Sequence, residues 1–170
     1  EDSVGTYVGW TLQSTINVGT AKVTGYEANY SQPLGFLPYG GKYFNVFANY
    51  TKIQLEGSNE TDFTGFVPES ASLGVNYSRK PIVATVRWNY RGADRRGLAG
   101  SALPGGFNYI KFFPSVDVSF EYQVSRRVSI FGSSRNVFGA PRLYERYTSE
   151  TPAYSKIYRN SPVGVMNAIG

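Results

Sequence analysis

The segment Ser70–Arg91, with the sequence SASLGVNYSRKPIVATVRWNYR, decides the fold. Apolar residues alternate with small or polar ones from Ser70 to Ser78 and again from Ile82 to Arg91. An alternation with a period of two is the pattern of a β-strand that has two unlike faces. Ser78–Pro81 joins the two runs as a tight turn, so the segment predicts two successive antiparallel strands.

The same alternation recurs on both sides of this segment. Five further strands are predicted, at Ala21–Gln32, Lys42–Gln54, Ser115–Val124, Val128–Val137 and from Lys156 to the end of the chain. Pro162 disturbs the last of them. The seven strands together predict an all-β fold, an antiparallel up-and-down meander.

The connections between these strands alternate in length. Ser78–Pro81 and Ser125–Arg127 are tight turns, and Pro33–Gly41 is a medium turn rich in Pro and Gly. Three long polar connections lie between them, at Leu55–Glu69, Gly92–Phe112 and Phe138–Ser155. Short turns on one side and long loops on the other are typical of outer-membrane β-barrels. Such long loops are uncommon in compact domains.

The two faces of the predicted strands differ in chemistry. One face is apolar and ends repeatedly in tyrosine, at Tyr30, Tyr50, Tyr77, Tyr90 and Tyr122. The other face is polar, with Phe47 as an exception. Aromatic girdles at lipid–water interfaces have this arrangement. We expect Arg87, Arg91, Arg135 and Lys52 to line a watery lumen or its mouth, and Tyr39 and Tyr43 to anchor a turn at the membrane interface.

Backbone hydrogen bonding sets a further condition. A sheet that spans a lipid bilayer must close on itself, because unpaired N–H and C=O groups are costly there. Seven strands are too few to form such a barrel alone, because bacterial single-chain barrels have an even number of strands, from 8 upward. We therefore expect two open edges that pair with the rest of a barrel or with a neighbour.

Composition excludes several classes of function. Cysteine and histidine are both absent, which removes disulfides, thiol nucleophiles, His-based catalysis and most zinc sites. Asp117 and Glu121 lie about 13 Å apart along a strand, too far for a glycosidase pair. We predict no enzyme, no catalytic or metal-binding residues and no cofactor; the substrate-binding residues stay unknown. The chain has no run of 18 apolar residues that would predict a transmembrane helix.

The net charge is +5, and most of the Lys and Arg residues are spread along the chain. We therefore expect no nucleic-acid partner. The densest cationic group is Arg91, Arg95 and Arg96, in a Gly-rich connection. It is either a solvated basic loop or a site that attracts anions.

Six motifs resemble TonB-dependent outer-membrane receptors, in the order and spacing of that family. Asn17–Glu27 is similar to the family's N-x-G-x-A-x-x-x-G-x-E segment, and Ala48–Thr51 resembles the strand that follows it. The other four are Val67–Tyr77, Arg87–Arg91, Val116–Tyr122 and Val128–Phe138, which ends in the family's Asn136-Val-Phe.

The resemblance covers the chain from about Asn17 to its end. It implies that residues 1–170 are the C-terminal portion of a 22-stranded transmembrane β-barrel in the bacterial outer membrane. The family's N-terminal plug would lie outside this portion, and the chain would stop just before the family's terminal aromatic residue. The implied partners are outer-membrane lipid, the rest of the barrel with its plug, and a TonB-type coupling protein. The implied function is energised uptake of an iron chelate, cobalamin or an oligosaccharide.

Three alternatives stay open. A passive porin-type channel shares the architecture but has no plug. A soluble β-sandwich binding module would collect Leu73, Val75, Val86, Val118 and Phe120 in a dry centre between two layers. A carboxylate enzyme would bring two acids together in a cleft.

Overall fold

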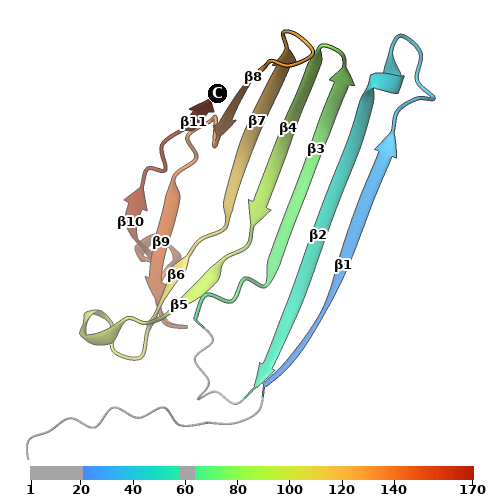
Figure 1. Cartoon of the computed structure of the whole chain (residues 1–170). Coiled ribbons are helices and arrows are strands. Elements are labelled where there is room, and N and C mark those ends of the chain that lie inside the picture. The colour runs from blue at the N-terminus through green and yellow to red at the C-terminus, as the bar shows by residue number, and fades with distance from the viewer. Residues whose placement is uncertain (1–20, 58–63) are drawn as a thin grey trace, which may run out of the picture.

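The structure is a computed structural model, and it describes residues 21–57 and 64–170. Seven antiparallel strands form the main sheet (Figure 1). In spatial order they are β1 (Ala21–Pro33), β2 (Phe44–Gly57), β3 (Glu69–Arg79), β4 (Ile82–Arg91), β7 (Phe113–Gln123), β8 (Ser129–Arg135) and β11 (Met166–Ile169). The all-β, antiparallel class predicted from the sequence is confirmed.

A second, distal sheet has four strands. They are β5 (Asp94–Leu98), β6 (Phe107–Ile110), β9 (Arg142–Tyr147) and β10 (Ile157–Ser161), in the order β10-β9-β6-β5. Each of them is the neighbour along the chain of one main-sheet strand: β5 of β4, β6 of β7, β9 of β8, and β10 of β11. The distal sheet therefore repeats the spatial order of these four strands beyond their ends. Single-turn 3₁₀ helices lie at Gly41–Tyr43, Gly100–Ala102 and Ala153–Ser155.

The distal sheet corrects two expectations about loops. Gly92–Phe112 and Phe138–Ser155 were expected to be connections without strands, yet they hold β5, β6 and β9. These strands are short, and a bulge between Arg95 and Gly97 interrupts the alternation of β5. Strands of four to six residues, one of them with a bulge, show too little periodicity to be recognised in the sequence. Of Leu55–Glu69, residues 58–63 lie outside the described part.

The last predicted strand is also corrected. The stretch from Lys156 to the end forms β10 and β11, which belong to different sheets. Pro162 and the three residues after it separate them. Proline has no N–H to give to a strand ladder, so a continuous strand is broken there.

Strand register defines the two faces of the main sheet. Val46, Val75, Val86 and Val118 pair in one row across four strands, and Ala48, Leu73, Trp88 and Val116 pair in the next. We call the side that carries these rows the apolar face. The opposite side, which carries the row Asn29, Asn49, Ser72, Asn89 and Ser115, is the polar face. The two faces predicted from the alternation are therefore the same two faces that the strand pairing defines.

The apolar face is not the wall of a core. Leu73 is 55% exposed, Val86 50% and Phe120 45%. The two sheets do not pack face to face, because the described strands of one make no substantial contact with those of the other. Within the described residues, Ile110 is the one buried hydrophobic side chain. The main sheet is a single layer with its apolar side chains uncovered.

The main sheet is also open at its sides. Over the described residues, β1 and β11 are its outermost strands and do not pair with each other. No helix of the described part is long and apolar enough to cross a membrane.

Candidate functional site on the polar face

Charged side chains are divided unequally between the two faces of the main sheet. Six lie on the polar face by register: Glu27, Arg87, Arg91, Asp117, Glu121 and Arg135. On the apolar face, Arg79 lies at the end of the short turns, Lys52 and Glu69 lie level with the end of β3 beside the long connections, and Lys22 and Glu56 lie further out on β1 and β2. Between Arg79 and the level of Lys52 and Glu69, which is the middle of the apolar face, the described strands carry no charge, whereas the middle of the polar face has several.

Lys52 is the exception among the residues expected at the lumen. It pairs with Tyr26 on one side and Glu69 on the other, which places it on the apolar face. The physical reason is its position two residues after Tyr50, whose hydroxyl donates a 2.7 Å hydrogen bond to Glu69 Oε1 on the same face. The other three cations, Arg87, Arg91 and Arg135, lie on the polar face as expected.

Hydrogen-bonded amides and hydroxyls run across the polar face. The amide of Asn29 donates to Glu27 Oε1 at 3.0 Å, and the amide of Asn49 donates to Asn29. The hydroxyl of Ser72 donates to Asn49 Oδ1 at 3.2 Å. This continuous polar row spans β1, β2 and β3, and it gives the face the donors and acceptors that a hydrated solute needs.

Phe47 is the apolar exception on this face, and its surroundings explain it. It pairs with Gly74, and a Cβ at Gly74 would lie 2.7 Å from Phe47 Cε1. The ring therefore occupies the space that a side chain on β3 would fill. The guanidinium of Arg87 lies 5.3 Å from the ring centroid on the side of β4. Phe47 is thus covered by a cation, as in cation–π pairs.

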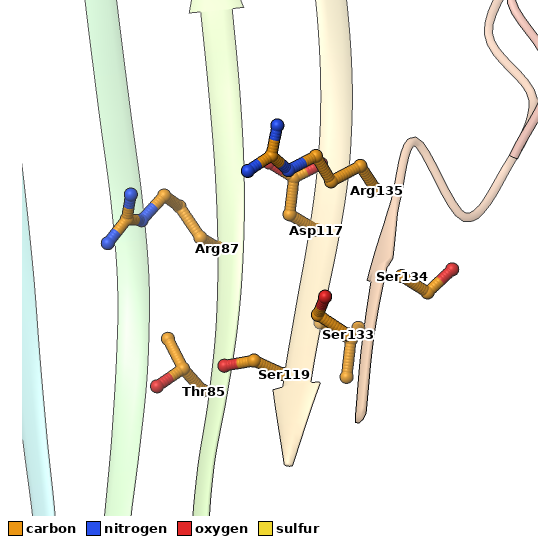
Figure 2. A pocket seen from close by; sticks show the side chains of 8 residues that line it. Thr85, Arg87, Asp117, Ser119, Ser133, Ser134 and Arg135 are labelled. Carbon is orange, nitrogen blue, oxygen red and sulfur yellow. The ribbon is translucent and has the colours of Figure 1, made fainter. Parts of the chain in front are cut away.

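Asp117 lies in a hollow of about 240 Å³ on the polar face. Figure 2 shows it between Arg87 and Arg135, with Ser119 further along the same strand and Thr85 and Ser133 on the neighbouring strands β4 and β8. Asp117 accepts 2.9 Å hydrogen bonds from the Asn89 side chain and from the backbone N–H of Asn136. The carboxylate is therefore held in place beside two guanidinium groups that can offer hydrogen bonds to an anionic or polar solute.

Comparisons of the chain with protein-family models, with curated proteins and with solved structures found no match.

Asn136 is a buried residue that links several segments of the chain. In the sequence it stood out only as part of the motif Val128–Phe138. Its side chain is 3% exposed, and its amide donates to the carbonyls of Ala140 at 3.2 Å and Val163 at 2.8 Å. Its Oδ1 accepts from Ala140 N at 3.0 Å. The backbone is left-handed, with φ of 53°, a conformation for which Asn is favoured. One residue thereby joins β7, the β8–β9 connection and the β10–β11 connection.

Asp94 is a second buried residue that links neighbouring segments, and its role was not predicted from the sequence. It is 1% exposed and accepts hydrogen bonds from Arg91 at 2.8 Å and from Arg96 at 3.1 Å. The signal was present, because a single acid stands inside the densest group of arginines. Two members of that group therefore bind a buried carboxylate where β4 passes into β5. They are not simply a solvated basic loop.

The distal sheet is lined with aromatic and cationic side chains. Tyr109 and Tyr147 stack with centroids 4.1 Å apart, and Lys156 Nζ lies 4.4 Å from the Tyr147 ring. Burial raises the pKa of the Tyr147 hydroxyl, and the neighbouring Tyr109 and Glu145 raise it further.

Among the described residues, no group of three or more His, Cys, Asp or Glu side chains could hold a metal ion.

Proposed function

We propose that this chain is a segment of the wall of a transmembrane β-barrel in the bacterial outer membrane, within a TonB-dependent transporter. The apolar face meets lipid, and the polar face meets the water-filled interior. The observation that carries the proposal is the division of charge, with six charged residues on one face and none in the middle of the other.

The energetics favour this orientation of the sheet. A Lys or Arg on the lipid side costs about 2–4 kcal/mol at the middle of a bilayer. Arg87 and Asp117 both lie near the middle of their strands, on the polar face. In contrast, removing a side chain such as Leu73 or Val86 from water contributes roughly 1.5–3 kcal/mol. A bilayer against the apolar face therefore gains the free energy of removing apolar side chains from water and avoids the cost of placing charges in lipid.

The length of the apolar band supports the same proposal. Tyr90 lies at one end of the band, and Ile82, the partner of Tyr122, lies at the other. Their eight-residue separation on β4 corresponds to about 26 Å along the strand. Tilted by about 40°, this spans roughly 20 Å, close to the height of about 25 Å of the apolar band of such barrels.

The ends of the strands give the direction. Short turns face the periplasm in outer-membrane barrels, and long connections face the cell exterior. The distal sheet, formed within the long connections, would then extend the wall outside the membrane. Arg87, Asp117 and Arg135 would border the path of a hydrated ligand through the barrel. The family resemblance adds the plug, the coupling protein and the class of ligand, which is an iron chelate, cobalamin or an oligosaccharide.

Membrane fractionation tests the first part of the proposal. We expect the protein that carries this chain to float with phospholipid vesicles and to stay with them through a high-pH carbonate wash. Recovery as a detergent-free, soluble monomer would contradict the membrane assignment and favour the β-sandwich alternative.

An uptake assay in cells separates the importer from a passive channel. We expect ligand accumulation to stop when a protonophore collapses the proton-motive force, because the energy would come through the coupling protein. A porin-type channel would be favoured if vesicles that contain the protein swell freely in solutions of uncharged sugars.

A further inference from the structure

The short-turn end of the main sheet is strongly basic. Residues 33–44, 78–82 and 123–129 form its three connections with the flanking strand ends. Five cations lie in them, Lys42, Arg79, Lys80, Arg126 and Arg127, and no Asp or Glu does. All five side chains are exposed. This end therefore concentrates positive charge without acidic neighbours in the same segments.

Aromatic rings place two of these cations at the border of the apolar face. Arg79 lies on that face, two residues beyond Tyr77. Its guanidinium carbon is 4.9 Å from the centroid of the Tyr43 ring, and Lys42 Nζ is 5.2 Å from the same ring. Tyr43 in turn meets Tyr77 edge-on at 6.4 Å. Aromatic rings of this kind settle where hydrocarbon meets water, which is also the level of lipid headgroups.

The turn that carries Arg126 and Arg127 is held by local hydrogen bonds. The Ser125 hydroxyl oxygen accepts from the backbone N–H groups of Arg127 at 3.2 Å and Val128 at 3.1 Å. The Val128 carbonyl accepts from Val124 at 3.0 Å and from Ser125 at 3.1 Å. The two arginines therefore stay close to the end of β7 and β8.

We propose that this basic end binds the headgroups of anionic phospholipids in the leaflet that surrounds the short turns. The inference rests on the proposed membrane-spanning function. It follows from charge complementarity, because a cluster of Lys and Arg beside a membrane surface attracts acidic lipids. The phosphate oxygens accept hydrogen bonds from guanidinium and ammonium groups, while the acyl chains lie along the apolar face.

Electron paramagnetic resonance with spin-labelled lipids tests the proposal. The protein that carries this chain is reconstituted in phosphatidylcholine vesicles with trace spin-labelled phosphatidylglycerol or phosphatidylcholine. The immobilised fraction of each label measures its association with the protein surface. We expect phosphatidylglycerol to be preferred by about threefold or more at low salt, and the preference to fall towards one in about 1 M salt.

Three double variants locate the effect. Arg79→Gln with Lys80→Gln, and Arg126→Gln with Arg127→Gln, should each reduce the preference about twofold. Lys156→Gln with Arg159→Gln removes the same charge from the distal sheet and should leave the preference unchanged.

The outcomes separate the two proposals. Immobilised lipid without preference, or a preference that both turn variants retain, overturns the headgroup site at the short turns and leaves the proposed membrane-spanning function standing. No immobilised lipid of either kind means that the protein is not in the bilayer, which overturns the proposed function itself.

Discussion

Gly74 and Phe47 show how a single residue can look misplaced in a pattern and still be explained. Phe47 breaks the polar alternation of β2, and the sequence offers no reason for it. The register supplies the reason, because Phe47 lies opposite Gly74, the residue of β3 that leaves room for a ring. Arg87 then reaches over the ring from β4. The three residues come from three strands, and only their pairing brings them together.

Substituting Gly74 should therefore be costly. A Cβ at this position would lie 2.7 Å from Phe47 Cε1 and 2.8 Å from the backbone oxygen of Val86. We expect Gly74→Val to lower the free energy of unfolding by about 1–3 kcal/mol, as overpacking does. Urea unfolding in lipid vesicles measures the change. Gly132→Val is the matched control, because the nearest atom to its Cβ is Ala168 O at 3.8 Å. Equal effects at the two glycines would contradict the crowding at Gly74.

Asn136 allows a second prediction at the residue scale. Asn136→Ala removes three side-chain hydrogen bonds and leaves the Val163 carbonyl without its amide donor. We expect a loss of about 3 kcal/mol, from unsatisfied buried groups and from a positive φ that alanine adopts poorly. Asn160→Ala, at an exposed position of β10, should change stability little. Equal melting curves for the two variants would show that Asn136 does not hold the junction.

At the scale of elements, long strands were predictable and short ones were not. The range predicted for β4 matches the structure, and β3 extends the predicted range by one residue at each end. Both alternate over ten or more residues, with Val83 on the polar face as the exception in β4. β5, β6 and β9 were missed, because four to six residues with bulges and neighbouring Gly and Pro contain too few repeats. β10 and β11 were merged, since their assignment to different sheets depends on pairing partners far away in the sequence.

Adjacent residues of β3 test the difference between the faces. Leu73 lies on the apolar face and Ser72 on the polar face. Leu73→Arg should cost about 2–4 kcal/mol in a bilayer, since it places a charge against lipid. Ser72→Arg should cost less than about 1 kcal/mol, because the new cation meets water. Urea unfolding in vesicles compares them, and a larger penalty at Ser72 would reverse the assignment of the faces.

The distal sheet has a pH dependence of its own. Because burial raises the pKa of Tyr147 above its ordinary value of 10.0, the folded state holds this proton more tightly than the unfolded state. The resulting stabilisation is complete below pH 10 and is lost as the pH rises through the pKa of the folded state. We expect thermal stability to fall from pH 9 to pH 11, and Tyr147→Phe to reduce that fall. Tyr154→Phe, at an exposed tyrosine, should leave the fall unchanged.

At the scale of the whole molecule, the two sheets form one continued surface. Four strands of the main sheet pass through buried polar junctions at Asp94 and Asn136 and then continue, in the same order, as the distal sheet. The alternation of short and long connections was predictable from the sequence. The strands within the long connections were not, because the distal sheet depends on the pairing of β6 with β9, two segments that are more than thirty residues apart.

The polar site was predictable in part for a related reason. Alternation alone placed Arg87, Arg91 and Arg135 on one face, because the period of two is a local property. Lys52 was expected at the lumen with them, and this expectation was wrong, because Lys52 follows Ala48 and Tyr50 at even spacing and so lies on the apolar face. The hollow around Asp117 requires the relative register of β4, β7 and β8 and the fold of Asn136 against β7, neither of which a single strand contains.

The central claim is that the main sheet turns one face to lipid and the other to water. A cysteine scan along β3 tests it most directly, since the 170-residue chain has no cysteine of its own. Nitroxide labels are placed one at a time at Ser72, Leu73, Val75 and Asn76 in the protein reconstituted in vesicles. Labels at Leu73 and Val75 should collide mainly with dissolved oxygen, and labels at Ser72 and Asn76 mainly with a water-soluble nickel complex. If Leu73 and Val75 are as accessible to nickel as Ser72 and Asn76, or are shielded from both reagents, the lipid-facing assignment is wrong.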